Sequence, residues 1–370
     1  MIGTPTPHPS PLVLRSVTTR GVLVPLTFEL GTSAAVISSV PLLLVDLLTD
    51  QGVVGRAYGF CYSPSGARAV AGHIAEAVEL LDGQPISPHG AAEVLARRFR
   101  LLGVAGPVRM ALSLLDMALW DALAVSLGQP LVRLLGGALR PIPAYDSRGL
   151  GRMGPERLAA EAEALLAMGL GAMKLRLGYA TLAEDLAALH AVRARIPAHT
   201  LVMVDYNQAL TPAEALLRGR ALQHEGIAWL EEPIRHDDYR GNAAIAEALH
   251  VPLQIGENFN GPEAMLQALA ARACDYVMPD VARIGGVTGW MQAAGIAAAC
   301  GIEMSSHLMP EVSVHLLAAS TRAHWLEYVD WADAILEQPL EVVDGHVVPP
   351  DRPGAGMVWD EHKIGRLETL

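Results

Sequence analysis

Three short runs follow one another at a regular interval: LVMVDYN at positions 201–207, AWLEEP at 228–233 and LQIGEN at 253–258. Each run is apolar until it ends in acidic or amide side chains, and sequence rich in Ala and Leu separates it from the next. Short apolar runs that alternate with helical sequence are typical of β-strands joined by helices. The three runs therefore predict consecutive βα units.

The same rhythm extends in both directions from these runs. A capping box with Pro at the first helical position, from Thr211 to Glu214, predicts the start of one intervening helix. Eight strands within roughly 190 residues predict a (β/α)8-type barrel, and an open doubly wound sheet is the alternative that this alternation permits. The further expected strands are IPAYDS (142–147), AMKLRLG (172–178), YVMPD (276–280), EMSSH (303–307) and HWLEY (324–328).

The N-terminal third has a different pattern, which predicts an α+β arrangement. Alternating apolar residues at about 12–26, 41–50 and 52–58 predict three antiparallel strands. Helical spacing follows in the segments 65–81, 88–100 and 107–127. No long linker separates this region from the repeated units.

Composition limits the classes of function. The chain has 370 residues, 51% of them hydrophobic, which is enough for two domains with a large core. Its net charge of −12 and its lack of a long basic cluster argue against a nucleic-acid partner. Neither a signal peptide nor a membrane span is expected, and three cysteines outside any CxxC pair predict free thiols in a reducing cytoplasm.

Polar residues stand at the ends of nearly all the expected strands. In a barrel, the carboxyl ends of the strands meet at one pocket, where such folds place their active sites. One or two strand-end acids would be ordinary solvated loop residues, whereas a series in register predicts a single site. The series comprises Ser147, Lys174, Arg176, Asp205, Asn207, Glu231, Glu232, Glu257, Asn258, Asp280, His307 and Glu327.

Three of these acids indicate a metal site. Asp205, Glu231 and Glu257 are spaced by 26 residues, so consecutive strands direct three carboxylates at one point. Without a cation they would repel one another, and all-oxygen ligation suits Mg²⁺. Asn207 lies on the same face as Asp205 and could serve the metal or its surroundings. Three separate surface acids are the alternative.

The remaining strand-end residues suggest acid–base chemistry. Asp280 and His307 end neighbouring strands, and a carboxylate bonded to one imidazole nitrogen raises the basicity of the other. Lys174 and Arg176 share one face of their strand, across the barrel from His307, where they either balance the acids or act on the opposite face of a substrate. Glu327, if protonated, could hydrogen-bond a substrate carboxylate.

A glycine motif offers a competing interpretation. Residues 149–154 spell GxGxxG between an expected strand and a helix, which is the context of a dinucleotide-binding fingerprint. The next strand ends in Lys174 and Arg176 rather than in the acid that binds a ribose hydroxyl. An NADP-dependent dehydrogenase could use Arg176, but this hypothesis leaves the three spaced acids unexplained.

The motifs VDYNQ, EEP, GEN, MPD, IGGVTGW, MSSHL and AHWLE together resemble the enolase superfamily, and within it the mandelate racemase family. The similarity runs from about Val13 to Ile364 and includes YDS at 145–147 and VPLTFELGTSA near the N-terminus. It implies an N-terminal α+β capping domain (1–130), a modified (β/α)7β TIM-type barrel (131–340) and a C-terminal segment that returns to the cap (341–370). It also implies a homo-oligomer.

The resemblance assigns a role to each strand-end residue. It makes Asp205, Glu231 and Glu257 the Mg²⁺ ligands, and it makes His307, with Asp280, the base for one face of the α-carbon. The expected reaction is abstraction of the α-proton of a small 2-hydroxycarboxylate to give a metal-stabilised enolate. In the same pattern, Glu327 is the acid that stabilises the enolate, Ser147 a contact for the substrate carboxylate, Lys174 a cation beside it, and Asn207 a nearby polar contact.

One residue departs from the family pattern. Mandelate racemase has Lys-x-Lys on the second barrel strand, with the second Lys as base for the other face, whereas this chain has Lys174 and Arg176. Arginine is a poor proton acceptor, so racemisation is in doubt, and an acid-sugar dehydratase with His307 as single base is the alternative. The expected capping loop at 27–37 is rich in apolar residues and carries only one charge, Glu29, which favours an apolar substrate side chain instead. A catalytically inactive metal-binding homologue is the non-enzyme alternative, and the intact acids and dyad argue against it.

Overall fold

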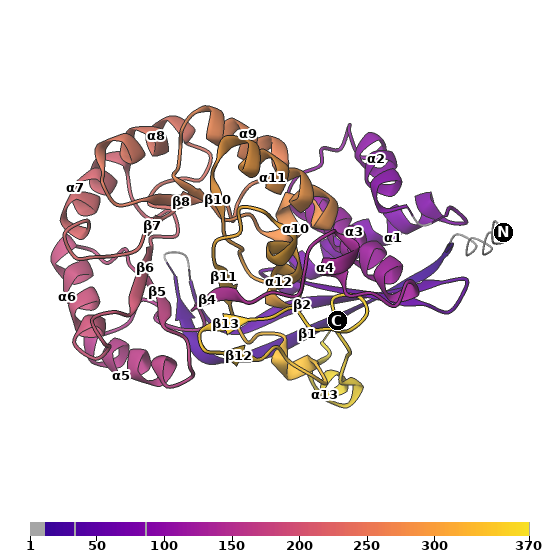
Figure 1. Cartoon of the computed structure of the whole chain (residues 1–370), viewed down its shortest axis with the longest axis horizontal. Helices are drawn as coiled ribbons and strands as arrows, with labels where there is room; N and C mark the ends of the chain where they lie inside the picture. Colours follow the sequence, from indigo (N-terminus) through magenta and orange to yellow (C-terminus); the bar gives the residue numbers. More distant parts are fainter. Residues whose placement is uncertain (1–11, 33–34, 86, 370) are drawn as a thin grey trace, which may run out of the picture.

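The computed structural model describes residues 12–32, 35–85 and 87–369. Its N-terminal part is an antiparallel sheet in the order β1-β2-β3, with helices packed against it (Figure 1). Apolar side chains from β2 and from α3 are buried together there, which supplies the core of this part. The elements are β1 (Leu14–Gly31), β2 (Val36–Thr49), β3 (Val54–Phe60), α1 (Pro64–Leu81), α2 (Pro88–Arg98), α3 (Gly106–Ser126) and α4 (Leu131–Leu134).

Eight parallel strands form the barrel that the sequence predicts. Each pairs with the next from β4 to β10, and β11 pairs with β4. Hydrogen bonds from Ser306 N to Trp325 O and from His324 N to Met304 O join the last two strands and close the ring. The strands are β4 (Ile142–Asp146), β5 (Ala172–Arg176), β6 (Leu201–Asp205), β7 (Leu230–Glu231), β8 (Leu253–Ile255), β9 (Tyr276–Val277), β10 (Glu303–Met304) and β11 (Leu326–Tyr328).

A helix follows each of the first seven strands, which gives the expected (β/α)7β arrangement (Figure 1). Thr211 does form a capping box with Glu214, and Thr181 forms a second one with Glu184. The open doubly wound sheet is excluded because the sheet closes. The helices are α5 (Pro155–Leu166), α6 (Leu182–Arg193), α7 (Pro212–Leu222), α8 (Tyr239–Ala248), α9 (Pro262–Ala270), α10 (Val281–Ile284), α11 (Gly286–Cys300) and α12 (Pro310–Ala319).

Several strands are shorter than the sequence runs suggest. Only two residues of 228–233 and two of 276–280 keep strand pairing. Glu231 is the last residue of β7, whereas Asp280 lies beyond β9 and pairs with His307 through an isolated bridge. The apolar part of each run is buried on both sides, as expected for parallel strands covered by helices.

The segment 27–37 is not the loop that the sequence suggests. Strand β1 continues to Gly31 and β2 begins at Val36, with a register shift between Pro25 and Leu30. Between the two strands Thr32 N donates to Ala35 O at 2.8 Å, and residues 33 and 34 lie outside the described residues. The expected lid is therefore the end of a long β-hairpin, and it is held by main-chain pairing up to Gly31↔Val36.

The GxGxxG segment contacts this hairpin. The main-chain N of Arg152 donates to Gly31 O at 2.8 Å, and the side-chain Nε of Arg152 donates to Thr32 O at 3.0 Å. A Cβ on Gly151 would lie 2.2 Å from Gly31 N, so the close approach of the two backbones requires glycine there. The motif is a docking contact between barrel and hairpin.

The end of the chain contacts both parts. Strand β13 (His346–Val347) pairs with β12 (Val342–Val343) and with β4, after the short helix η1 (Asp333–Ile335). Helix α13 (Glu361–Leu367) lies against β1, and Thr369 N donates to Gly21 O at 2.9 Å. The domain boundaries at 130 and 340 remain a prediction.

The cysteines are free, as expected; Cys61 and Cys274 are buried and Cys300 is exposed. No helix among the described residues is both long enough and apolar enough to cross a bilayer.

Candidate active site

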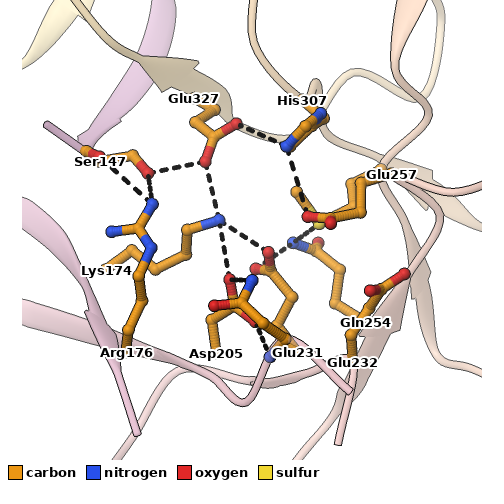
Figure 2. A network of polar contacts seen from close by, with 12 residues as sticks. Ser147, Lys174, Arg176, Asp205, Glu231, Glu232, Gln254, Glu257, His307 and Glu327 are labelled. Atoms are coloured by element: carbon orange, nitrogen blue, oxygen red, sulfur yellow. Dashed lines mark hydrogen bonds and ion pairs between the residues drawn. The ribbon is translucent and has the colours of Figure 1, made fainter. Parts of the chain in front are cut away.

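The strand-end residues surround one cavity at the mouth of the barrel. Its volume is about 340 Å³, and the β1–β2 hairpin forms part of its wall. Figure 2 shows Lys174 reaching inward between Glu327 on one side and Asp205 and Glu231 on the other. The barrel thus brings the expected residues to a single place.

The three spaced acids converge there. One oxygen each from Asp205, Glu231 and Glu257 can be chosen so that all lie within 4.8 Å of one another. Burial raises the pKa of Glu231 to about 8, although Lys174 Nζ lies 2.7 Å from its Oε1 and opposes this shift. A buried set of carboxylate oxygens this close, with one ammonium group among them, fits a hard divalent cation.

Neighbouring side chains fix two of these carboxylates. Asn207 donates from its main-chain N to Asp205 Oδ1 at 2.7 Å and from Nδ2 to Asp205 Oδ2 at 2.9 Å. Trp229 Nε1 donates to Glu231 Oε2 at 2.9 Å from the floor of the barrel. Sequence reasoning missed Trp229, yet its position two residues before Glu231 on one strand places both on the same face.

A fourth acid is buried beside this cluster. Glu232 is fully buried, and its pKa is raised well above the usual value, first by burial and then by Glu257. Asn258 Nδ2 donates to both oxygens of Glu232, at 2.9 and 3.0 Å, and to Glu257 Oε1 at 3.2 Å. Asn258 therefore links Glu232 to one of the three spaced acids.

His307 and Asp280 form the pair that the sequence suggests. His307 Nδ1 lies 2.7 Å from Asp280 Oδ2, and Nε2 lies 3.3 Å from Glu257 Oε2. Burial alone would lower the pKa of His307, but Glu257, Glu327 and Asp280 outweigh it and raise the pKa to about 9. A cation on Glu257 would remove the largest of these raising influences, so the imidazole would return toward its neutral, basic form.

Glu327 differs from the protonated acid that the sequence suggests. Burial would raise its pKa, but Lys174 and His307 lower it well below the ordinary value. Lys174 Nζ is 2.7 Å from Glu327 Oε1, Ser147 Oγ donates to the same oxygen at 2.7 Å, and Leu308 N donates to Oε2 at 2.9 Å. Both Ser147 and Glu327 are thus held by the protein itself before any substrate arrives.

Arg176 turns toward its own loop. Its Nη1 donates to Gly149 O at 2.8 Å, and its Nη2 donates to Ser147 Oγ at 2.9 Å. The side chain lines the cavity, but this hydrogen bonding makes it a brace for the segment after β4 (Figure 2). The Lys-to-Arg departure therefore replaces a group that can lose a proton by a fixed structural cation.

An apolar wall faces these charged groups across the cavity. The Phe60 ring packs edge-on against Trp331 at 5.1 Å between centroids and lies 4.3 Å from the Tyr62 ring. Leu30 and Ile37 from the hairpin line the same cavity. The cavity is thus lined by the acidic cluster and by apolar side chains.

Comparison with known proteins identifies the family. Residues 14–136 match the N-terminal domain of mandelate racemase / muconate lactonizing enzyme, and residues 157–363 match the enolase C-terminal domain-like family. The chain belongs to the mandelate racemase/muconate lactonizing enzyme family of the enolase superfamily. The resemblance inferred from the motifs is confirmed, and the relatives are named enzymes, so this chain is an enzyme of that superfamily.

Curated relatives in this family catalyse different net reactions. L-talarate/galactarate dehydratase of Salmonella typhimurium strain LT2 is 29% identical, with 88% of this chain and 82% of that protein covered. A 3,6-anhydro-alpha-L-galactonate cycloisomerase of Streptomyces coelicolor is 32% identical, with 73% and 75% covered.

Two solved structures of the superfamily are similar over nearly the whole chain. A magnesium-bound enolase of alphaproteobacterium bal199 is 42% identical, has a TM-score of 0.95 and covers 97% of this chain and 100% of its own. An enolase of Bradyrhizobium, complexed with magnesium and mandelic acid, is 39% identical, has a TM-score of 0.92 and covers 98% and 99%.

Proposed function

We propose that this protein is a Mg²⁺-dependent enzyme that removes the α-proton of a 2-hydroxycarboxylate bearing an apolar side chain. The position of His307 is the main support for this proposal. Its Nδ1 is fixed by Asp280 at 2.7 Å, while Nε2 faces the cavity beside Glu257. An imidazole held in one orientation beside a metal-type carboxylate cluster is suited to proton abstraction.

Asp205, Glu231 and Glu257 would hold the metal ion, in line with the magnesium found in the similar enolase structures. When bound, Mg²⁺ supplies positive charge that stabilises the negative charge developing on the substrate carboxylate. Lys174 contributes a second, permanent cation at the same place, because its pKa is raised well above the usual value by Glu231 and Glu327 despite burial. Lys174 is therefore a charge stabiliser in this proposal and not a base.

His307 accepts the α-proton at Nε2, and Asp280 stabilises the imidazolium that results. Ser147 and Asn207 hold Glu327 and Asp205 in place through the hydrogen bonds described above. Arg176 braces the loop after β4, so the chain offers one base and one reactive face.

The apolar wall supports the side-chain class. Phe60, Tyr62 and Trp331 offer aromatic surface where the side chain of a bound acid would lie. The Bradyrhizobium enolase with mandelic acid, an aromatic 2-hydroxy acid, is consistent with this class.

A second candidate is dehydration of an acid sugar. Arg176 removes the usual second base, and L-talarate/galactarate dehydratase is among the relatives. In that reaction His307 would abstract the proton next to the carboxylate, and the imidazolium would return it to the departing β-hydroxyl, which would leave as water. The resulting enol would tautomerise to a 2-keto acid. The apolar wall favours the first candidate.

The test is α-hydrogen exchange in D2O with Mg²⁺, followed by NMR, with each mandelate enantiomer and a set of acid sugars given separately. We expect exchange of one mandelate enantiomer only, because His307 serves one face. The His307→Asn variant should lose this exchange by at least about a thousandfold, in line with the contribution of a general base.

His190→Asn is the matched control, since this histidine is exposed on α6 and bonds only to Glu225. Retained exchange in His307→Asn would overturn the proposed base. Formation of 2-keto product from an acid sugar, without mandelate exchange, would favour the dehydratase instead.

A homo-oligomeric state and a cytoplasmic location remain predictions from the sequence. Sedimentation of the purified chain would test the first.

A further inference from the structure

A second cavity lies at the seam between the N-terminal part and the barrel, next to the candidate active site. Its volume is about 480 Å³. One side is formed by Tyr62 and by Arg109 of α3, and the other by His236 and Asn260 from loops of the barrel and by Arg283 of α10. The proposed mechanism makes no use of this space.

The charged side chains that line this seam cavity are all positive. Arg109 and Arg283 line it, and no acidic side chain does. Within the described part of the chain, neither arginine has a carboxylate oxygen within the 4.0 Å that defines an ion pair. The charge of Glu263 reaches Arg109 only as a longer-range electrostatic interaction. The charges of Asp280 and Glu257 reach Arg283 in the same way.

Two buried polar atoms in the seam cavity lack partners among the described residues. They are Nε of Arg109 and Nδ1 of His236. A Cβ built on Gly261 would lie 2.8 Å from Arg109 Nη2 and 2.4 Å from Glu263 Oε2, so the Glu263 carboxylate is near one end of the guanidinium and leaves Nε without a partner. Buried nitrogens without a hydrogen-bond partner cost free energy that a bound anion would recover.

We propose that the seam cavity binds a small oxyanion, either an inorganic phosphate or the carboxylate of a dicarboxylic acid, between Arg109, His236 and Arg283. Guanidinium groups bind such anions through paired, charge-assisted hydrogen bonds. The imidazole of His236 adds a neutral donor or acceptor at the same place.

The site is separate from the metal-type cluster but connected to it. Arg283 stacks on the Tyr62 ring at 4.7 Å and donates from Nη1 to Asn258 Oδ1 at 2.5 Å. Asn258 in turn donates to Glu257. Tyr62, Asn258 and Arg283 line both cavities, so the two sites share these side chains.

The experiment is a calorimetric titration of the metal-free full-length protein with inorganic phosphate, at constant ionic strength set by chloride. We expect saturable binding that weakens at least tenfold in Arg109→Met and in His236→Phe. The control is Arg176→Met, which removes a cation from the candidate active site and should change the phosphate affinity less than twofold. Circular dichroism and thermal melting establish that each variant is folded, and Arg109→Gln replaces Arg109→Met if the latter is not.

A second arm separates the two sources of the anion, using substrates of the proposed function. If the site serves the far carboxylate of a substrate, Arg109→Met raises KM for a dicarboxylic 2-hydroxy acid but not for mandelate. If it serves a free anion, KM is unchanged for both while phosphate binding is lost. Absence of phosphate binding, or binding that is lost in Arg176→Met and kept in Arg109→Met, would overturn the proposal.

Discussion

Glu231 is held from three sides, and this determines how it can serve a metal ion. Lys174 approaches one oxygen, while Trp229 donates to the other and Gln254 Nε2 lies 3.5 Å from it. Side chains that orient a metal ligand commonly matter nearly as much as the ligand itself. Trp229 is therefore a positioning residue for the proposed metal site.

We predict that Trp229→Phe weakens Mg²⁺ binding by about ten- to a hundredfold, because Glu231 loses its indole donor while the aromatic packing largely remains. Isothermal titration with Mg²⁺ measures this directly. Trp325→Phe is the control, since Trp325 packs against the same buried cluster without bonding to a carboxylate. Equal affinity in Trp229→Phe and wild type would contradict the assigned role.

At the scale of elements, the contact between the hairpin and the barrel fixes the wall of the site. Gly31 and Gly151 meet backbone to backbone, and Leu30 and Ile37 beside this contact line the cavity. The chemical groups lie on the barrel strands instead. Movement of the hairpin should therefore change substrate binding more than proton transfer.

Gly151→Ala tests this division. Its Cβ would lie 2.2 Å from Gly31 N, so the hairpin must shift. We expect KM for the preferred 2-hydroxy acid to rise about tenfold, equivalent to ~1.4 kcal/mol, while kcat changes little. Gly154→Ala is the control, because nothing lies within 4 Å of its Cβ position. A fall in kcat with unchanged KM would argue against the hairpin as a binding wall.

Sequence reasoning succeeds for elements whose signal is local. The acids at 205, 231 and 257 recur once per βα unit, so their convergence follows from the barrel alone. The hairpin was misread although the strand signal is present: Leu26, Phe28 and Leu30 are more buried than Thr27 and Glu29, which are exposed, so the alternation continues past Pro25. Arg176 was expected to face the substrate, because the chain does not reveal that Gly149 O and Ser147 Oγ would accept its hydrogen bonds.

Contacts between segments that are far apart in the chain could not be predicted from the sequence pattern. Ser147 and Glu327 are 180 positions apart, and their hydrogen bond follows only from β4 and β11 being neighbours in the closed ring. The seam cavity likewise combines Arg109 with residues from two barrel loops and from helix α10.

At the scale of the whole molecule, a buried acid links the N-terminal part to the barrel. Asp116 of α3 accepts from Thr288 N at 2.9 Å and from Thr288 Oγ1 at 2.6 Å, at the start of α11. Burial raises its pKa to about 7, although the bonds from Thr288 lower it. The native state therefore holds a proton there that the unfolded chain releases above about pH 4.

The sign of the pH effect follows from this raised pKa. The proton on Asp116 stabilises the fold fully below pH 4, and that contribution is lost as the pH rises through about 7. We predict that Asp116→Asn, compared with wild type, gains about 3 kcal/mol of relative stability between pH 5 and pH 8. Urea unfolding of the metal-free proteins at both pH values measures it, with the exposed Glu79→Gln as control. A difference independent of pH would show that Asp116 is ionised in the fold.

The position of Lys174 has a consequence for how the protein folds and takes up its metal ion, in addition to its role in catalysis. Its ammonium group lies within 3.4 Å of Asp205 and within 2.7 Å of Glu231 and Glu327, so these acids have a covalently attached counter-ion. We therefore expect the chain to complete folding while magnesium is scarce, because the acids already have a cation in their midst. Loading with metal then becomes a late and reversible event, and a chelator should empty the enzyme without unfolding it.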